Sequence, residues 1–196
     1  MSKKAVFIHG SPRKNGTTRA LAQSAKAALE EAGVLCDWID AASLDFKHPG
    51  CIACYKCQRS PDYGCHVRDG LAQAVNSLPG YDAIVLATPI YWHTQPAQMK
   101  MLIDRMFSLI KFDENHTFFS PLKGKSLGLL ATGGGVPAGN LELLEAQWRT
   151  ASTNIGLQFL SCLFPHCPPE ADAAKTPERL ADAHKFGTKL ARLPGA

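Results

Sequence analysis

The chain begins with an apolar stretch that runs directly into a polar loop and then into a helical pattern. Residues 5–8 are Ala-Val-Phe-Ile, which has the length and branched composition of a buried parallel strand. Residues 10–18 are polar. Apolar residues then recur at helical spacing until Gly33, at Leu21, Ala25, Ala28, Leu29 and Ala32. A strand, a short loop and a helix N-terminus are therefore predicted to meet at one point.

This polar loop has the composition of an anion-binding site. The amino end of a helix offers free backbone N–H groups and the positive end of the helix dipole. Arg13 adds a fixed positive charge, and uncharged donors come from Ser11, Asn15, Thr17 and Thr18. The loop is therefore predicted to hold one phosphate monoester. The alternative is a capped helix start with an ordinary surface loop.

Two other phosphate-binding loops are excluded by spacing. A P-loop has four residues between its glycines and then a lysine, whereas five residues separate Gly10 from Gly16 and Thr17 follows. The dinucleotide-binding pattern G-x-G-x-x-G is absent at this position as well. Nucleotide hydrolysis is therefore disfavoured.

The composition indicates one globular unit. With 196 residues, 45% of them hydrophobic, the chain is predicted to form a single domain over 1–196. No apolar run reaches membrane-spanning length and no signal sequence is evident, so we expect a cytoplasmic protein without a membrane partner. The formal charge of +4 is modest and the basic residues are dispersed, which disfavours nucleic-acid binding.

Strand and helix patterns alternate along the chain. After the first unit, strands are predicted at 34–40, 83–88, 126–132 and 157–164. Helical spacing marks residues 71–78, 99–110 and 141–155, and Thr176-Pro177-Glu178 begins a last helix. This alternation predicts an α/β fold in which helices cover both faces of a parallel sheet.

Ligands of such sheets bind at the carboxyl ends of the strands, so the loops that follow strands are the candidate site. The loop at 11–18 suits a phosphate, and the loop at 89–93 offers aromatic and backbone surface for a flat ring. The glycines at 133–135 let backbone N–H groups approach the polar edge of such a ring. Together the loops predict a site for a phosphorylated planar heterocycle.

Two motifs resemble the flavodoxin-like NAD(P)H-dependent FMN reductases. The run at 10–17 is similar to the FMN phosphate loop of that family. Residues 89–92, followed by 96–100 and 103–105, resemble its second signature. The resemblance implies a flavodoxin-like, doubly wound fold with five parallel strands in the order 2-1-3-4-5 and bound FMN. It also implies a homodimer or homotetramer in which neighbouring subunits help to close the flavin site.

The resemblance also implies roles for individual residues. Ser11, Arg13, Asn15, Thr17 and Thr18 would hold the phosphate, Pro89, Ile90, Tyr91 and Trp92 would line the isoalloxazine, and Thr132, Gly133 and Gly134 would contact its other edge. His93 is a candidate proton donor, although a loop histidine more often makes a surface hydrogen bond. Flavin hydride chemistry does not require it, because the flavin N5 carries the reaction.

Four of the seven cysteines lie close together, in a cysteine-rich loop at about 46–66: Cys51, Cys54, Cys57 and Cys65. Such density in a reducing compartment indicates metal or redox chemistry rather than structural disulfides. The Cys-x₂-Cys-x₂-Cys spacing lets one turn wrap thiolates around an iron–sulfur cluster, and a mononuclear zinc site is the alternative. Cys36, Cys162 and Cys167 are interpreted as small buried residues.

This spacing is similar to that of the iron–sulfur flavoproteins, a branch of the same family in which a [4Fe-4S] cluster passes electrons to FMN. Other branches keep a similar cysteine set without a cluster, with thiols that are free or oxidised. Both states of the cysteine loop therefore stay open.

The function that follows is electron transfer from NAD(P)H through FMN to a small acceptor such as a quinone, a free flavin, a nitro or azo compound, or dioxygen. With a cluster, a ferredoxin-like donor would supply the electrons instead. A non-enzymatic electron carrier or redox sensor is a further alternative, disfavoured because such carriers are usually acidic. A phosphatase or kinase lacks a credible nucleophile or metal–carboxylate set.

Overall fold

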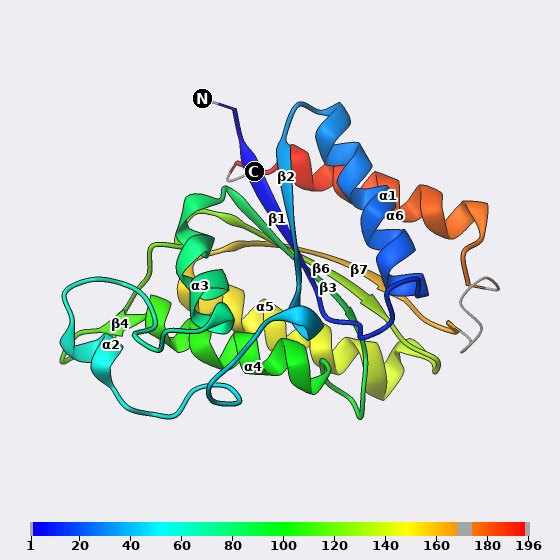
Figure 1. The fold of residues 1–196 in the computed structure, drawn as a ribbon. Helices are drawn as coiled ribbons and strands as arrows, with labels where there is room; N and C mark the ends of the chain where they lie inside the picture. Colours follow the sequence, from blue (N-terminus) through cyan, green and yellow to red (C-terminus); the bar gives the residue numbers. More distant parts are fainter. Residues whose placement is uncertain (1, 168–173, 195–196) are drawn as a thin grey trace.

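The structure is a computed structural model that describes residues 2–167 and 174–194. Its centre is a sheet of five parallel strands in the order β2-β1-β3-β6-β7 (Figure 1). The strands are β1 (Lys4–His9), β2 (Leu35–Asp40), β3 (Ala83–Pro89), β6 (Ser126–Thr132) and β7 (Gln158–Phe164). Numbered along the chain, this is the predicted order 2-1-3-4-5, and the flavodoxin-like fold class is confirmed.

Helices cover both faces of the sheet (Figure 1). On one face lie α1 (Thr17–Glu31) and α6 (Pro177–Ala191). The other face carries α3 (Gly70–Ser77), α4 (Ala97–Arg105) and α5 (Glu142–Ile155). The last helix begins where the sequence predicted, after Thr176. The Thr176 side chain accepts a hydrogen bond from the N–H of Arg179, and Pro177 occupies the first turn.

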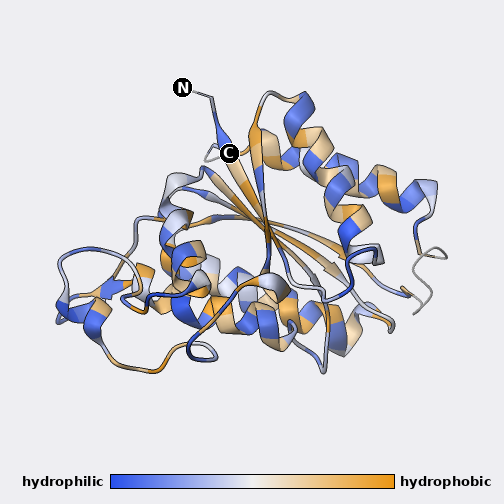
Figure 2. Ribbon diagram, viewed as in Figure 1, coloured by the Kyte–Doolittle hydropathy of each residue, from blue (hydrophilic) through white to orange (hydrophobic). Residues whose placement is uncertain are grey.

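The two faces of the sheet bury separate cores. In β1, Val6 and Ile8 pack with α3, α4 and α5, whereas Ala5 and Phe7 pack with α1 and α6. Figure 2 shows the result: the central strands are hydrophobic along their length, and the helices are hydrophobic on one side only. A strand that is buried on both faces needs a continuous apolar run, which is why β1 and β3 could be recognised.

Two segments differ from the sequence-based expectation. The helix expected over 99–110 ends at Arg105 and continues as a 3₁₀ turn at Met106–Leu109. A short hairpin of β4 (Lys111–Phe112) and β5 (Phe118–Phe119) follows, which the sequence analysis did not predict. Strands of two residues are too short to show an alternating pattern.

The cysteine-rich loop contains a short helix, α2 (Lys56–Arg59), that lies beside β4 (Figure 1). The Lys111 ammonium group of β4 donates to the carbonyl oxygens of Cys57 and Ser60. The hairpin therefore supports the middle of this loop. No helix of the described residues is long and apolar enough to cross a lipid bilayer.

Candidate functional site

A cavity of about 290 Å³ opens at the carboxyl edge of the sheet. The strands β1, β3 and β6 are neighbours, so the loops that follow them meet there. The lining residues are Ser11, Arg13, Gly16, Thr17, Thr18, Pro89, Ile90, Tyr91, Thr132, Gly133, Gly134 and Cys167. The cavity thus combines a polar loop, an apolar wall and a glycine-rich wall.

The polar side of this cavity is the loop between β1 and α1. The helix begins at Thr17, and its N-cap, Gly16, makes no side-chain cap. Because Gly16 has no side chain, the first-turn amides of α1 have no N-cap acceptor, which suits the binding of an anion there. Thr18 is fixed across the cavity floor, because its hydroxyl group lies 2.8 Å from that of Thr132.

Gly10, at the start of this loop, is held from both sides. Its N–H donates to the carbonyl of Ala87 at 2.8 Å, and its own carbonyl accepts from the Gln98 side chain at 2.8 Å. A Cβ at this position would lie 2.9 Å from the Cε of Met99. Glycine therefore allows the loop to pass tightly over α4.

The loop after β3 makes a tight turn that separates its aromatic residues. Tyr91 and Thr94 form an isolated antiparallel β-bridge: each backbone N–H donates to the carbonyl of the other residue, at 2.7 and 3.1 Å. Between them, Trp92 and His93 both have left-handed φ angles, of 46° and 65°, which is the conformation of a type I′ turn. Tyr91 consequently faces the cavity, whereas Trp92 projects away and is 94% exposed.

The structure brings most of the predicted flavin-site residues to this one cavity, and leaves two of them outside it. Asn15 lines a neighbouring hollow together with Lys14, Arg19 and Lys175, and Trp92 projects into solvent. The exposed side chain of His93 lies 3.1 Å from the carbonyl of Gly139 through its Nδ1 atom.

Cys167 lines the same cavity, although the sequence analysis interpreted it as a small buried residue. Its N–H donates to the carbonyl of Gly133 at 2.8 Å, and its sulfur accepts from the guanidinium group of Arg179 at 2.9 Å. Burial raises the pKa of its thiol despite this positive charge. Its position just beyond the last strand, β7, is the signal that could have placed it at the site.

A second cavity, of about 20 Å³, lies within the cysteine-rich loop and is lined by all four clustered cysteines: Cys51, Cys54, Cys57 and Cys65. Left-handed backbone at Ala53 and Tyr55 turns the chain between them. Burial raises the pKa of the Cys57 thiol; the Gln58 side chain opposes this effect, and negative charge on the three other cysteines adds to it. The three other sulfurs therefore lie within electrostatic range of the Cys57 thiol.

These thiols fit the donor set of an iron–sulfur cluster. No group of three or more His, Cys, Asp or Glu side chains in the described part of the chain is arranged around a single metal ion. In a cubane cluster, however, each thiolate binds a different iron atom, so the four sulfurs need not point at one centre. Four cysteines line one cavity and so supply this donor set, although the cavity volume of about 20 Å³ is too small for a cubane in this conformation of the loop.

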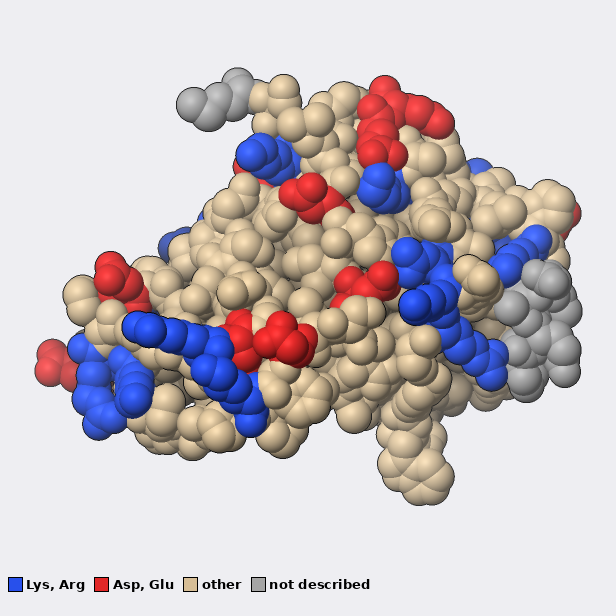
Figure 3. Space-filling view, viewed as in Figure 1, with Lys and Arg blue, Asp and Glu red and all other residues tan. Residues whose placement is uncertain are grey.

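Lys and Arg side chains gather at two places on the face shown in Figure 3. One lies over the cysteine-rich loop and the other near the loop between β1 and α1. In the sequence, this cysteine-rich loop and its flank carry Lys47, Lys56, Arg59 and Arg68, all of them exposed. Such charge favours anionic ligands and acidic partners.

Comparison with known proteins agrees with this geometry. The family model described as NADPH-dependent FMN reductase matches residues 3–183. The chain belongs to this family. An iron–sulfur flavoprotein of Archaeoglobus fulgidus is 32% identical over 133 residues, which cover 68% of this chain and 56% of the relative. Iron–sulfur flavoprotein MJ1083 of Methanocaldococcus jannaschii is 32% identical over 102 residues, 52% of this chain and 51% of the relative.

These matches thus span only about half the length of those two relatives. Among solved structures, the NAD(P)H:quinone oxidoreductase from Methanothermobacter marburgensis superimposes with a TM-score of 0.76 at 16% identity, over 97% of this chain and all of the other. An azoreductase from Bacillus anthracis gives 0.72 at 16% identity, over 96% of this chain and 98% of the other. At such identities the likeness shows the fold.

A partly buried polar cluster at the ends of β1 and β2 was not expected from the sequence. The His9 side chain is 1% exposed, and its Nδ1 atom lies 2.9 Å from Oδ1 of Asp40. The carboxylate also accepts from Arg19 at 3.0 and 3.1 Å and from the Trp38 indole at 2.9 Å. Burial lowers the pKa of His9, and this effect outweighs the nearby carboxylate, which raises it.

This cluster predicts a stability that falls with acidification. The unfolded chain binds a proton at His9 below about pH 6.5, whereas the folded protein does so only at lower pH. The free energy of unfolding should therefore fall between about pH 7.5 and pH 5.5, by at most about 1.4 kcal/mol per pH unit. The pKa of Asp40 is lowered too, but its loss of charge belongs to more acidic conditions.

Urea unfolding of the wild type and of His9→Gln at both pH values measures this slope. We expect a smaller slope in His9→Gln. His48→Gln, which changes an exposed histidine, is the matched control and should keep the wild-type slope. Equal slopes in all three proteins would contradict the assignment to His9.

Proposed function

We propose that the chain is an FMN-dependent oxidoreductase that passes electrons from NAD(P)H through bound FMN to a small acceptor. The observation that carries this proposal is the cavity at the carboxyl edge of the sheet, in which a polar helix start faces an apolar and glycine-lined wall. Such a cavity suits a ligand with a phosphate at one end and a flat ring at the other. Membership of the FMN reductase family supports FMN as that ligand.

Different residues of the cavity would bind the phosphate and the ring of the ligand. Arg13 and the hydroxyl groups of Ser11, Thr17 and Thr18 would hold the phosphate, and the positive end of α1 would add to their attraction. The flavin would then lie between two walls, formed by Pro89, Ile90 and Tyr91 on one side and by Thr132, Gly133 and Gly134 on the other. Asn15 and Trp92 lie outside this cavity, so the proposal does not depend on them.

FMN supplies the hydride chemistry at its N5 position when it is bound. The protein would contribute orientation and a partly enclosed environment. His93 makes its contact at the carbonyl of Gly139, and we assign it no proton-transfer role. The acceptors that suit such chemistry are quinones, free flavins, nitro or azo compounds and dioxygen.

A homodimer or homotetramer belongs to the same proposal. Tyr91 is 46% exposed where it lines the cavity, and the neighbouring Trp92 is almost fully exposed. Large aromatic side chains at that level of exposure are typical of protein interfaces. A second copy of the chain placed over this turn would help to close the flavin cavity.

Steady-state kinetics distinguish an enzyme from an electron carrier. The purified, FMN-loaded protein is expected to oxidise NADH or NADPH with a small quinone as acceptor and no other protein present. Free FMN at the same concentration is the control for the uncatalysed reaction. Reduction that occurs only after addition of a separate reductase would identify a carrier instead.

The phosphate loop can be tested through FMN affinity. Arg13→Ala should weaken FMN binding by about 10- to 100-fold, because a charge-assisted hydrogen bond contributes about 1.5–3 kcal/mol. Lys14→Ala is the matched control, since Lys14 lies next in the chain but lines a different hollow. Fluorescence titration of the apoprotein with FMN measures both. A similar loss in both variants would mean that only general positive charge matters.

A second candidate is an iron–sulfur flavoprotein that receives electrons from a ferredoxin-like donor through a [4Fe-4S] cluster. The specific support is that four cysteines line one cavity, together with relatives that are named iron–sulfur flavoproteins. Cys51, Cys54, Cys57 and Cys65 would hold the cluster. The basic side chains around the loop would favour an acidic donor.

The ratio of iron to FMN, measured on protein purified without oxygen, decides between these candidates. About four iron atoms per FMN would establish one cubane cluster per flavin. FMN without iron would leave an NAD(P)H-dependent flavin reductase whose thiols are free or oxidised. Substitution of Cys57 by serine should abolish iron binding but not FMN binding, because the two cavities share no lining residue.

A further inference from the structure

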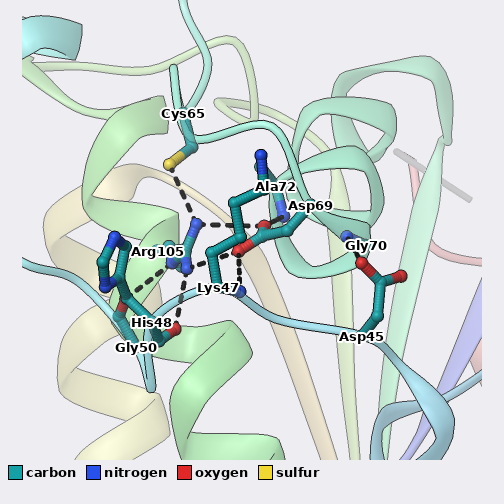
Figure 4. A network of polar contacts seen from close by, with 9 residues as sticks. All are labelled: Asp45, Lys47, His48, Gly50, Cys65, Asp69, Gly70, Ala72 and Arg105. Carbon is teal, nitrogen blue, oxygen red and sulfur yellow. Dashed lines mark hydrogen bonds and ion pairs between the residues drawn. The ribbon is translucent and has the colours of Figure 1, made fainter.

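A buried guanidinium group lies beneath the cysteine-rich loop, where α4 ends (Figure 4). The side chain of Arg105 is 1% exposed, and each of its five N–H bonds has an acceptor. Its Nε donates to the carbonyl of Gly50 at 2.6 Å, and its Nη2 to the carbonyl of His48 at 2.8 Å and to Asp69 at 2.9 Å. Its Nη1 is shared between Asp69 at 3.2 Å and the sulfur of Cys65 at 3.5 Å.

The partner carboxylate is equally enclosed. The side chain of Asp69 is 0% exposed, and it caps α3 by accepting the N–H of Ala72 at 3.0 Å. Its second oxygen accepts the N–H of Lys47 at 2.9 Å. Burial alone would raise the pKa of this carboxyl, but the two N–H groups and Arg105 lower it below its ordinary range. A buried ion pair is tolerated only when its remaining hydrogen-bonding capacity is satisfied in this way.

The groups that accept hydrogen bonds from Arg105 lie at both ends of the run of four cysteines. His48 and Gly50 lie shortly before Cys51, the first of the four clustered cysteines, and Cys65 is the last of the four. Arg105 therefore ties both ends of the loop to α4, while Asp69 ties α3 to the same point (Figure 4). The ends of the loop are in this way held together independently of its middle, which contacts the hairpin.

One contact in this network goes beyond support of the backbone. Arg59 and Lys111 also bind the loop, but their hydrogen bonds end on carbonyl oxygens. The guanidinium of Arg105 instead directs one N–H at a cysteine sulfur, although Asp69 already balances its charge. A positive donor beside a ligating sulfur favours the more reduced state of a metal centre, because it stabilises the added negative charge.

We propose that Arg105 is a positioning residue of the cysteine loop: its planar fork sets the separation of Cys51 and Cys65, and its charge tunes the centre that these cysteines hold. The tuning rests on the iron–sulfur function proposed above, whereas the positioning does not. The two effects are separable. Lysine keeps the positive charge but lacks the planar guanidinium group that reaches five acceptors. Methionine has neither the charge nor the guanidinium group.

The first experiment compares the wild type with Arg105→Lys and Arg105→Met, each reconstituted with ferrous iron and sulfide without oxygen. Iron per FMN should fall several-fold in both variants, because both lack the fork. The midpoint potential of the remaining cluster should shift to lower values in Arg105→Met and stay near the wild-type value in Arg105→Lys. A potential that is unchanged in Arg105→Met would overturn the tuning role and leave a merely structural ion pair.

The second experiment follows hydrogen–deuterium exchange of the metal-free, FMN-loaded proteins by mass spectrometry. Peptides that span 46–69 should exchange at least about tenfold faster in both Arg105 variants. Arg59→Met is the matched control, because Arg59 is exposed and bonds only the carbonyl of Cys54 within the loop. Wild-type exchange in Arg105→Lys and Arg105→Met would overturn the positioning role.

The two experiments also separate the proposals from each other. A wild-type protein that takes up no iron would refute the iron–sulfur function, and with it the tuning of a cluster. The exchange data would still decide the positioning role. Retention of FMN by each variant shows that the sheet has folded, since the flavin cavity shares no residue with the network around Arg105.

Discussion

The five strands share one direction, and this constraint decides where the chain can bind a ligand. In a parallel sheet all carboxyl ends lie at one edge, so the loops that follow different strands converge there. Thr18 and Thr132 are 114 residues apart in the sequence, yet their hydroxyl groups are 2.8 Å apart. The sheet thereby gathers a polar loop, an apolar wall and a glycine-rich wall from three separate segments.

Local sequence was enough to predict the frame of the molecule. The apolar run of β1 indicates a strand because burial on both faces leaves no room for polar residues, and Thr176-Pro177 marks the start of α6 because both residues satisfy the requirements of a helix N-terminus. The order of the strands came from the resemblance of the 10–17 and 89–105 segments to a known family, since periodicity alone does not specify which strands are neighbours.

What the sequence did not predict depends on contacts between distant residues or on unusual backbone. Arg105 belongs to a recognised motif, but nothing local indicates that it pairs with Asp69, which is 36 residues away. Trp92 looked like a residue of the flavin wall because it follows Tyr91. Left-handed φ angles at Trp92 and His93, positions that carry no glycine, direct it outward instead.

The position of Arg105 in the sequence also decides when, during synthesis, it can contact the cysteine-rich loop. Arg105 follows Cys65 by 40 residues and Gly50 by 55. During synthesis the four thiols therefore leave the ribosome before the guanidinium group that contacts Cys65. The hydrogen bonds from Arg105 to Gly50 and Cys65 can therefore form only after α4 has been synthesised, and a chain interrupted before residue 105 would carry the four thiols without them.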